Sequence, residues 1–248
     1  MGIGESTKAS LSKRPLWLSA MGLLAVLLFA YGVYLALVVS PPDHQQGQLI
    51  RIMYAHVSVA WVMFVAVTLM AVFGMLFLWR GSAKHDVWAT ANAELALFFS
   101  ALTLIGGMIY ARPTLNVFWT WDAKLTLTAL IFVLLAGYFI VRNLVDDPQR
   151  RGRVSAVIGI IVLVSLPFNW MAAEWFRTLH PAKSFAVTGS GVTDHADPIF
   201  RMILLYNFIV AGVIYTYFML ERVRIGKVEA ALADEAAVPV VKGETVRV

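Results

Sequence analysis

The sequence contains no cysteine and few charged residues. The absence of cysteine from all 248 residues excludes disulfide bonds, thiolate metal sites and covalent attachment of a cofactor through a Cys-x-x-Cys-His motif. Charged residues make up 14% and apolar residues 60% of the chain, and the mean hydropathy is +0.75. The glycine-rich Walker A pattern is also absent, so any use of ATP must belong to a partner. This composition favours lipid as the solvent.

Long apolar runs account for most of the chain. Each of six runs has the length that a helix needs to cross about 30 Å of hydrocarbon. Because the runs lack the alternating pattern of barrel strands, they predict helices, whose backbone groups bond within the segment. The fold class is therefore an all-α, polytopic membrane protein, in one domain of residues 1–248, with expected spans at 17–39, 52–78, 93–110, 125–141, 154–171 and 199–220.

The basic residues predict how these spans are oriented. If the N-terminus is cytoplasmic, fourteen of the 20 Lys and Arg residues lie on the cytoplasmic side. The six on the other side are Arg51, Arg112, Lys124, Arg177, Lys183 and Arg201. This asymmetry follows the positive-inside rule and predicts N-in, C-in topology. It also explains the basic pI without nucleic acid, because no basic stripe lies along one element.

Two terminal segments complete the topology. The first apolar run is too long for the core of a signal peptide, so we expect it to remain as the first helix. Residues 223–248 form the expected cytoplasmic tail, which is predicted to be helical to about Ala233.

Four of the five histidines lie on the predicted outer side. His56 is about one turn into the second expected span, and His180 follows the fifth. Two neutral imidazoles from different elements can hold haem iron from its two faces. The alternative is that each is a hydrogen-bonded residue at the membrane interface. His44 and His195 lie in polar loops and are weaker candidates, and His85 lies on the inner side.

The outer loop 111–124 carries an unusual aromatic segment. Phe118, Trp119 and Trp121 fall within four residues and are followed by Asp122. Aromatic faces offer large apolar contact to a flat macrocycle, whereas tryptophan is also common in the interfacial belts of membrane proteins. Asp122 is either a ligand contact or the N-cap of the next helix.

The residues from Val117 to Thr126 resemble the tryptophan-rich "WWD" signature of the haem-handling proteins of cytochrome c maturation. The two flanking histidines are placed as in the CcmC family, and residues 166–180 resemble that family's stretch before its second histidine. Six spans in about 250 residues also match this family. The family motif usually begins Trp-Gly-x-Trp-Trp and carries a later Arg; the positions that differ here are Leu115, Asn116, Phe118 and Lys124.

The resemblance implies a protein of the bacterial inner membrane that is not an enzyme. It implies non-covalent, transient binding of haem b at the periplasmic face and delivery to the haem chaperone CcmE, alongside CcmA, CcmB and CcmD. His56 and His180 are the expected axial ligands, and Phe118, Trp119, Trp121 and Asp122 the expected haem contacts. Further candidates are Trp170 and Trp175 for the ring, and Arg51, Arg112 or Arg177 for the propionates.

Two other classes of protein remain open. A b-type cytochrome or quinone-linked redox subunit would also hold haem, but its ligands are usually paired within the spans on facing helices. A membrane transferase would use Asp122, Glu174, Asp194 or Asp197 at the outer face, but these residues do not form an acidic pair with a spacing suited to metal and phosphate.

Overall fold

The computed structural model describes residues 13–43, 46–176, 178–180 and 198–236, and within these ranges the chain is helical, without strands. Six of the helices are long and apolar enough to cross a membrane, as the sequence predicts. A short π-helical segment, η1, ends the first of them, and this irregularity was not predicted. The elements are α2 (Leu16–Tyr34), η1 (Leu35–Val39), α3 (Ile50–Arg80), α4 (Ala83–Leu115), α5 (Ala123–Asn143), α6 (Pro148–Trp175) and α7 (Pro198–Ala236).

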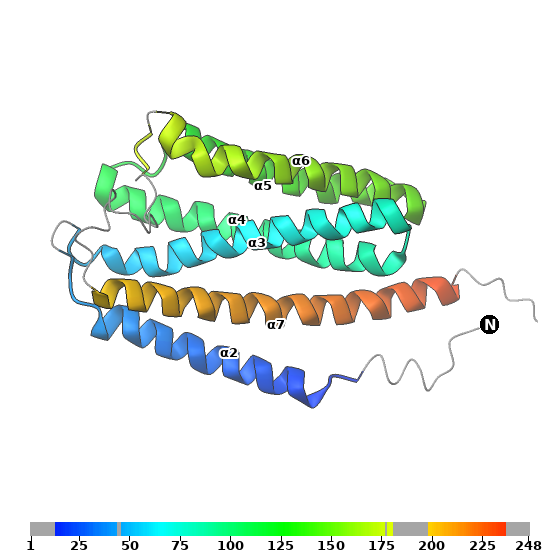
Figure 1. Cartoon of the computed structure of the whole chain (residues 1–248), viewed down its shortest axis with the longest axis horizontal. Helices are drawn as coiled ribbons and strands as arrows, with labels where there is room; N and C mark the ends of the chain where they lie inside the picture. Colours follow the sequence, from blue (N-terminus) through cyan, green and yellow to red (C-terminus); the bar gives the residue numbers. More distant parts are fainter. Residues whose placement is uncertain (1–12, 44–45, 177, 181–197, 237–248) are drawn as a thin grey trace, which may run out of the picture.

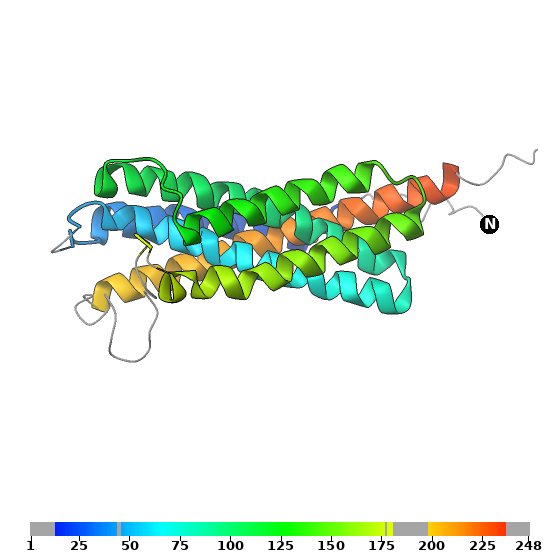
Figure 2. The same ribbon diagram turned by 90° about the horizontal axis from the view of Figure 1, so that it is seen from above.

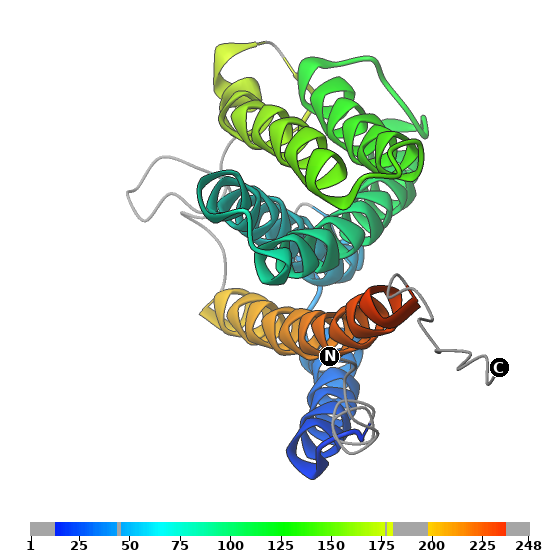
Figure 3. The ribbon, with the colours of Figure 1, turned by 90° about the vertical axis from the view of Figure 1, so that its right-hand side faces the viewer.

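The helices run side by side in successive layers (Figures 1 and 3). The pair α5 and α6 packs on the pair α3 and α4, α7 covers the other side of α3 and α4, and α2 lies outermost on α7. Figure 1 shows that α2 begins and α7 ends at the same end of the bundle. We call this the terminal end, and we call the opposite end, which carries the connections α2–α3 and α4–α5 and the last residues of α6, the site end.

Close packing of α3 on α6 depends on small residues. Gly152 of α6 lies against the ring of Phe77, which a side chain at that position would overlap. Gly74 of α3 lies against Ala156 of α6 in the same interface, where an added Cβ would be 3.3 Å from the alanine Cβ. Small residues let membrane helices approach closely and gain dispersion energy that lipid does not supply. The α3–α6 contact therefore holds these two helices together near the terminal end.

Most helices extend beyond the expected spans, and α4 does so furthest at its start. The third span was expected at 93–110, but α4 begins ten residues earlier and ends at Leu115. Its first turns carry Lys84, His85 and Asp86, which lower the hydropathy without interrupting the helix. The predicted loop 111–124 was therefore too long, since the connection from α4 to α5 spans only residues 116–122. The last helix ends at Ala236, close to the predicted limit.

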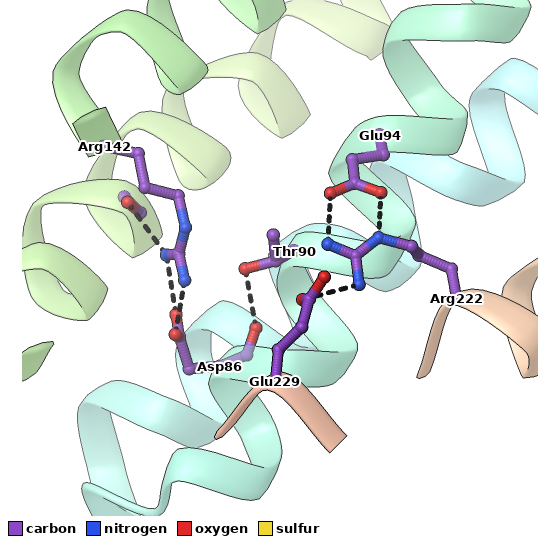
Figure 4. Close-up of polar contacts among 7 residues, drawn as sticks. Asp86, Thr90, Glu94, Arg142, Arg222 and Glu229 are labelled. Carbon is purple, nitrogen blue, oxygen red and sulfur yellow. Dashed lines mark hydrogen bonds and ion pairs between the residues drawn. The ribbon is translucent and has the colours of Figure 1, made fainter. Parts of the chain in front are cut away.

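Charged residues on α4 join it to its neighbours near the terminal end (Figure 4). Asp86 accepts two hydrogen bonds from Arg142 of α5, one at 2.8 Å from Nη1. Two turns further, Glu94 pairs with Arg222 of α7, with Nη2 of the arginine 2.8 Å from Oε1. Arg222 also binds Glu229 at 3.1 Å.

These pairs compensate charges that are costly to remove from water. The sequence alone assigns no role to Glu94; in the structure it forms an ion pair that joins α4 to α7. Because Asp86 and Glu94 lie on the same helix, α4 is held to both α5 and α7 at this end.

Candidate functional site

The site end brings together the segments that carry the predicted site residues. The start of α3, the end of α4, the start of α5 and the end of α6 all lie there (Figures 1 and 2). Hydrogen bonds tie the α2–α3 connection to these helices. Ser40 Oγ lies 2.7 Å from Tyr54 Oη of α3, and Tyr110 of α4 donates to Gln46 Oε1 at 2.7 Å. The α2–α3 connection is thus anchored to α3 and α4, which support the site.

His56 lies nearly two turns into α3, deeper than the single turn that the sequence suggested. The side chain is half-buried, and the imidazole packs against the backbone of α4 at Gly106 and Gly107. The Nδ1 atom is buried and has no hydrogen-bond partner. A buried polar atom without a partner is costly, and such atoms are often associated with function. The His56 ring is therefore not oriented by a hydrogen bond within the described residues.

His180 reaches the same region from the chain that follows α6. The end of α6 at Trp175 precedes it by five residues, and its backbone N–H donates to Thr178 Oγ1 at 2.8 Å. The imidazoles of His180 and His56 interact electrostatically, so the structure brings the two predicted ligands together. Of the other histidines, His85 lies near the terminal end on α4, while His44 and His195 fall outside the described residues.

The aromatic segment, residues 118–121, lies within the connection between α4 and α5. The rings of Trp119 and Trp121 meet edge to face with centroids 5.6 Å apart. Trp121 is 82% exposed and Phe118 is 58% exposed, whereas Trp119 is half-buried with its Nε1 buried and unpartnered. Exposed rings beside an unsatisfied indole N–H form an incomplete apolar surface, which a flat ligand would cover.

Polar contacts fix the end of this segment to α5 and α6. Asp122 is the N-cap of α5, because its Oδ1 accepts the backbone N–H of Leu125 at 3.0 Å; the capping alternative is thus confirmed. Lys124 donates from Nζ to the carbonyl of Asn169 in α6 at 2.9 Å, and the Asn169 amide donates to Thr128 at 2.9 Å. The aromatic segment is therefore held against the helix that leads to His180.

The secondary candidates lie in other surroundings. Trp170 contacts the rings of Trp61 and Phe64 on α3, and Trp175 contacts Phe168. Among the described residues, neither ring meets the pair Trp119 and Trp121. Arg51 donates to the carbonyl of Ser40 at 3.2 Å, and Arg177 falls outside the described residues.

Arg112 is the accessible basic group beside the aromatic segment. Its guanidinium lies over the Phe118 ring, 5.5 Å from the centroid, and donates to the Asn116 carbonyl at 3.1 Å. This cation is exposed, so it remains available to an anionic group of a ligand.

The arrangement suits a metal that is already held by most of its ligands, rather than a bare metal ion. Within the part of the chain that the structure describes, no three His, Asp or Glu side chains converge as a bare metal ion would require. Two imidazoles and a set of aromatic faces are instead what haem needs, because the porphyrin supplies four ligands and leaves two axial positions. The unpartnered indole nitrogen of Trp119 agrees with this fit.

Comparison with known proteins identifies the family. The family model described as heme exporter protein C matches residues 5–236. The chain belongs to this family. Heme exporter protein C of Bradyrhizobium diazoefficiens is 34% identical over 194 residues, which cover 77% of this chain and 72% of that protein. Proteins of the same name from Haemophilus influenzae and Escherichia coli K12 are 28% identical over 204 residues (81% and 80% covered) and 31% identical over 142 residues (57% and 58% covered).

The structure explains one departure from the motif of the heme exporter protein C family. Asn116 stands where the motif has glycine, and it caps α4 in the left-handed conformation with φ 59°. Glycine takes this conformation without strain, and asparagine is the next most tolerant residue. The substitution therefore preserves the turn that starts the aromatic segment, a turn that the sequence prediction placed several residues too early.

Two further departures preserve contacts with a different side chain. Phe118 retains an aromatic ring at its position, stacked under Arg112. Lys124, where the family motif has arginine, binds α6 through a single donor at 2.9 Å.

Proposed function

We propose that this protein binds haem at the site end and passes it to a haem chaperone during biogenesis of c-type cytochromes. The observation that carries the proposal is that His56 and His180, which come from separate elements, lie near enough to interact electrostatically, at the end of the bundle that also carries the aromatic segment. Relatives across most of the chain are named heme exporter protein C, which supports haem as the ligand.

The residues would divide the work as follows. His56 and His180 supply the axial ligands, while Phe118, Trp119 and Trp121 provide apolar contact to the porphyrin plane. Asp122 acts through its cap, which sets the backbone of the segment. Arg112 is placed to pair with a propionate. Binding of haem b is non-covalent, because the chain has no cysteine to form a thioether.

We place the site end at the periplasmic face of a bacterial inner membrane. The terminal end carries the start of α2 and the end of α7, and the larger share of the basic residues lies there. Basic residues favour the cytoplasmic side. This gives N-in, C-in topology. Haem is then presented outward, where the proposed chaperone, of the CcmE type, receives it.

The chain acts as a binding and transfer protein rather than as an enzyme. Its sequence has no nucleotide-binding motif, so energy from ATP would enter through partners of the CcmA and CcmB type, with CcmD as a further subunit. The exposed apolar faces of α2, which packs on α7 alone among the long helices in Figure 3, contact lipid or such membrane partners.

Transfer from membrane vesicles tests both the ligand and its side. Haem-loaded protein is prepared in right-side-out and in inside-out vesicles, and the soluble domain of a haem-free CcmE-type chaperone is added outside. We expect haem to move to the chaperone only from right-side-out vesicles. Retention of a stoichiometric, redox-cycling haem in both would instead indicate a b-type cytochrome, and transfer only from inside-out vesicles would reverse the proposed topology.

A further inference from the structure

His56 packs on a stretch of α4 that has no side chains. A Cβ added at Gly106 would lie 3.1 Å from His56 Nδ1, and one added at Gly107 would lie 3.3 Å from His56 Cε1. Both distances are shorter than ordinary contacts between carbon and its neighbours. The imidazole therefore occupies a slot that two consecutive glycines of α4 leave open, and a side chain at either position would crowd it.

The same ring is not oriented by a hydrogen bond. His56 Nδ1 is buried and has no partner among the described residues. Metal-binding histidines almost always donate their second nitrogen to a carboxylate, a carbonyl or water, which fixes the ring and raises its basicity. The backbone of Gly106 and Gly107 meets this ring instead, as a steric wall.

We propose that Gly106 and Gly107 are positioning residues that orient His56 by steric fit, an inference that rests on the proposed haem ligation. Packing takes the place of the missing hydrogen bond in setting the ring. Nδ1 lies nearer this wall, 3.1 Å from a Cβ added at Gly106, whereas Nε2 lies 4.0 Å from one added at Gly107, so we assign Nε2 to the iron.

This arrangement also sets the strength of the ligand. An imidazole whose second nitrogen donates no hydrogen bond is a weaker base, and so a weaker axial ligand, than one paired with an acceptor. The slot would therefore orient the His56 ring correctly while leaving its bond to the haem iron easily broken. A protein that must release haem benefits from both properties.

Alanine substitutions test the slot in a graded series. Gly106→Ala removes the most space and Gly107→Ala less, whereas Gly137→Ala of α5 is the matched control, since nothing lies within 4 Å of an added Cβ there. Alanine favours helices more than glycine does, so each variant should keep its helix. The measurements are the absorption spectrum of bound haem and, in haem-free protein, the rate at which diethyl pyrocarbonate modifies His56, followed by mass spectrometry.

We expect Gly106→Ala to lose the six-coordinate spectrum and to retain haem roughly tenfold less well, with partial rescue by imidazole. Gly107→Ala should have a smaller effect, and Gly137→Ala none. In haem-free protein the first two variants should speed modification of His56 in the same order. Wild-type rates in Gly106→Ala, or equal effects in the control, would overturn the slot. Failure of the proposed haem ligation would give a different result. His56→Ala would then leave the haem spectrum unchanged, while the rates of His56 modification in the haem-free glycine variants would still follow the series.

Discussion

Replacing His56 or His180 with alanine is expected to abolish the six-coordinate, low-spin spectrum of bound haem. Each variant removes one of two axial ligands, and the expected loss of haem per inserted protein is at least about tenfold. The helices should remain inserted, because neither imidazole is needed to satisfy a helix backbone. Absorption spectra of the purified variants, normalised to protein, measure the change, and added imidazole should refill the vacant position.

His85→Ala is the matched control for both variants. Its imidazole also has a buried, unpartnered Nδ1, but it lies near the terminal end, away from the proposed ligands. The control should therefore bind haem as the wild type does. An unchanged spectrum in His56→Ala or His180→Ala would remove that histidine from the ligand pair.

Alanine at Trp119 or Trp121 is expected to weaken haem retention without changing the ligation spectrum. An aromatic contact contributes about 0.5–1.5 kcal/mol beyond the area that it buries, which corresponds to roughly a two- to tenfold faster loss of haem. Phenylalanine at the same positions should have a milder effect, because it keeps an apolar ring. The dissociation rate of haem into an excess of an apo-globin acceptor measures the effect.

Trp79→Ala distinguishes a haem contact from a membrane anchor. Trp79 is 78% exposed, close to the 82% of Trp121, but it lies at the end of α3 beside Arg80, at the terminal end. Its loss should leave haem dissociation unchanged. If Trp121→Ala and Trp79→Ala both alter only insertion, with constant haem per inserted protein, the aromatic segment belongs to an interfacial belt.

The number of helices and their approximate positions could be read from the sequence because hydropathy reports on contact with lipid. The positions of helix ends were harder to predict where a helix continues past the apolar region. The first turns of α4, from Ala83, and those of α6, from Pro148, are polar and lower the hydropathy of any window. Asp147 as N-cap and Pro148 in the first turn were a local signal for the start of α6. The Asn116 cap was a similar signal for the end of α4.

The sequence indicates individual candidate residues more readily than it indicates their surroundings. His56 and His180 stood out because ionisable groups beside apolar runs are rare. The packing of His56 on Gly106 and Gly107 joins residues about fifty positions apart, and the pairing of Lys124 with the Asn169 carbonyl joins residues 45 positions apart. Such contacts depend on which helices are neighbours, and hydropathy contains no information on that.

The distance from the haem iron to a single nitroxide label tests most directly where haem binds. Because the chain has no cysteine, Val117→Cys and Leu144→Cys each introduce a unique labelling site. Val117, in the connection before α5, is 40% exposed, and Leu144, directly after α5, is 77% exposed. The 21 residues of α5 between them extend about 30 Å. Pulsed EPR on haem-loaded protein should give an iron–label distance roughly 20 to 30 Å longer from residue 144 than from residue 117. Equal distances, or a shorter one from residue 144, would contradict haem binding between His56 and His180.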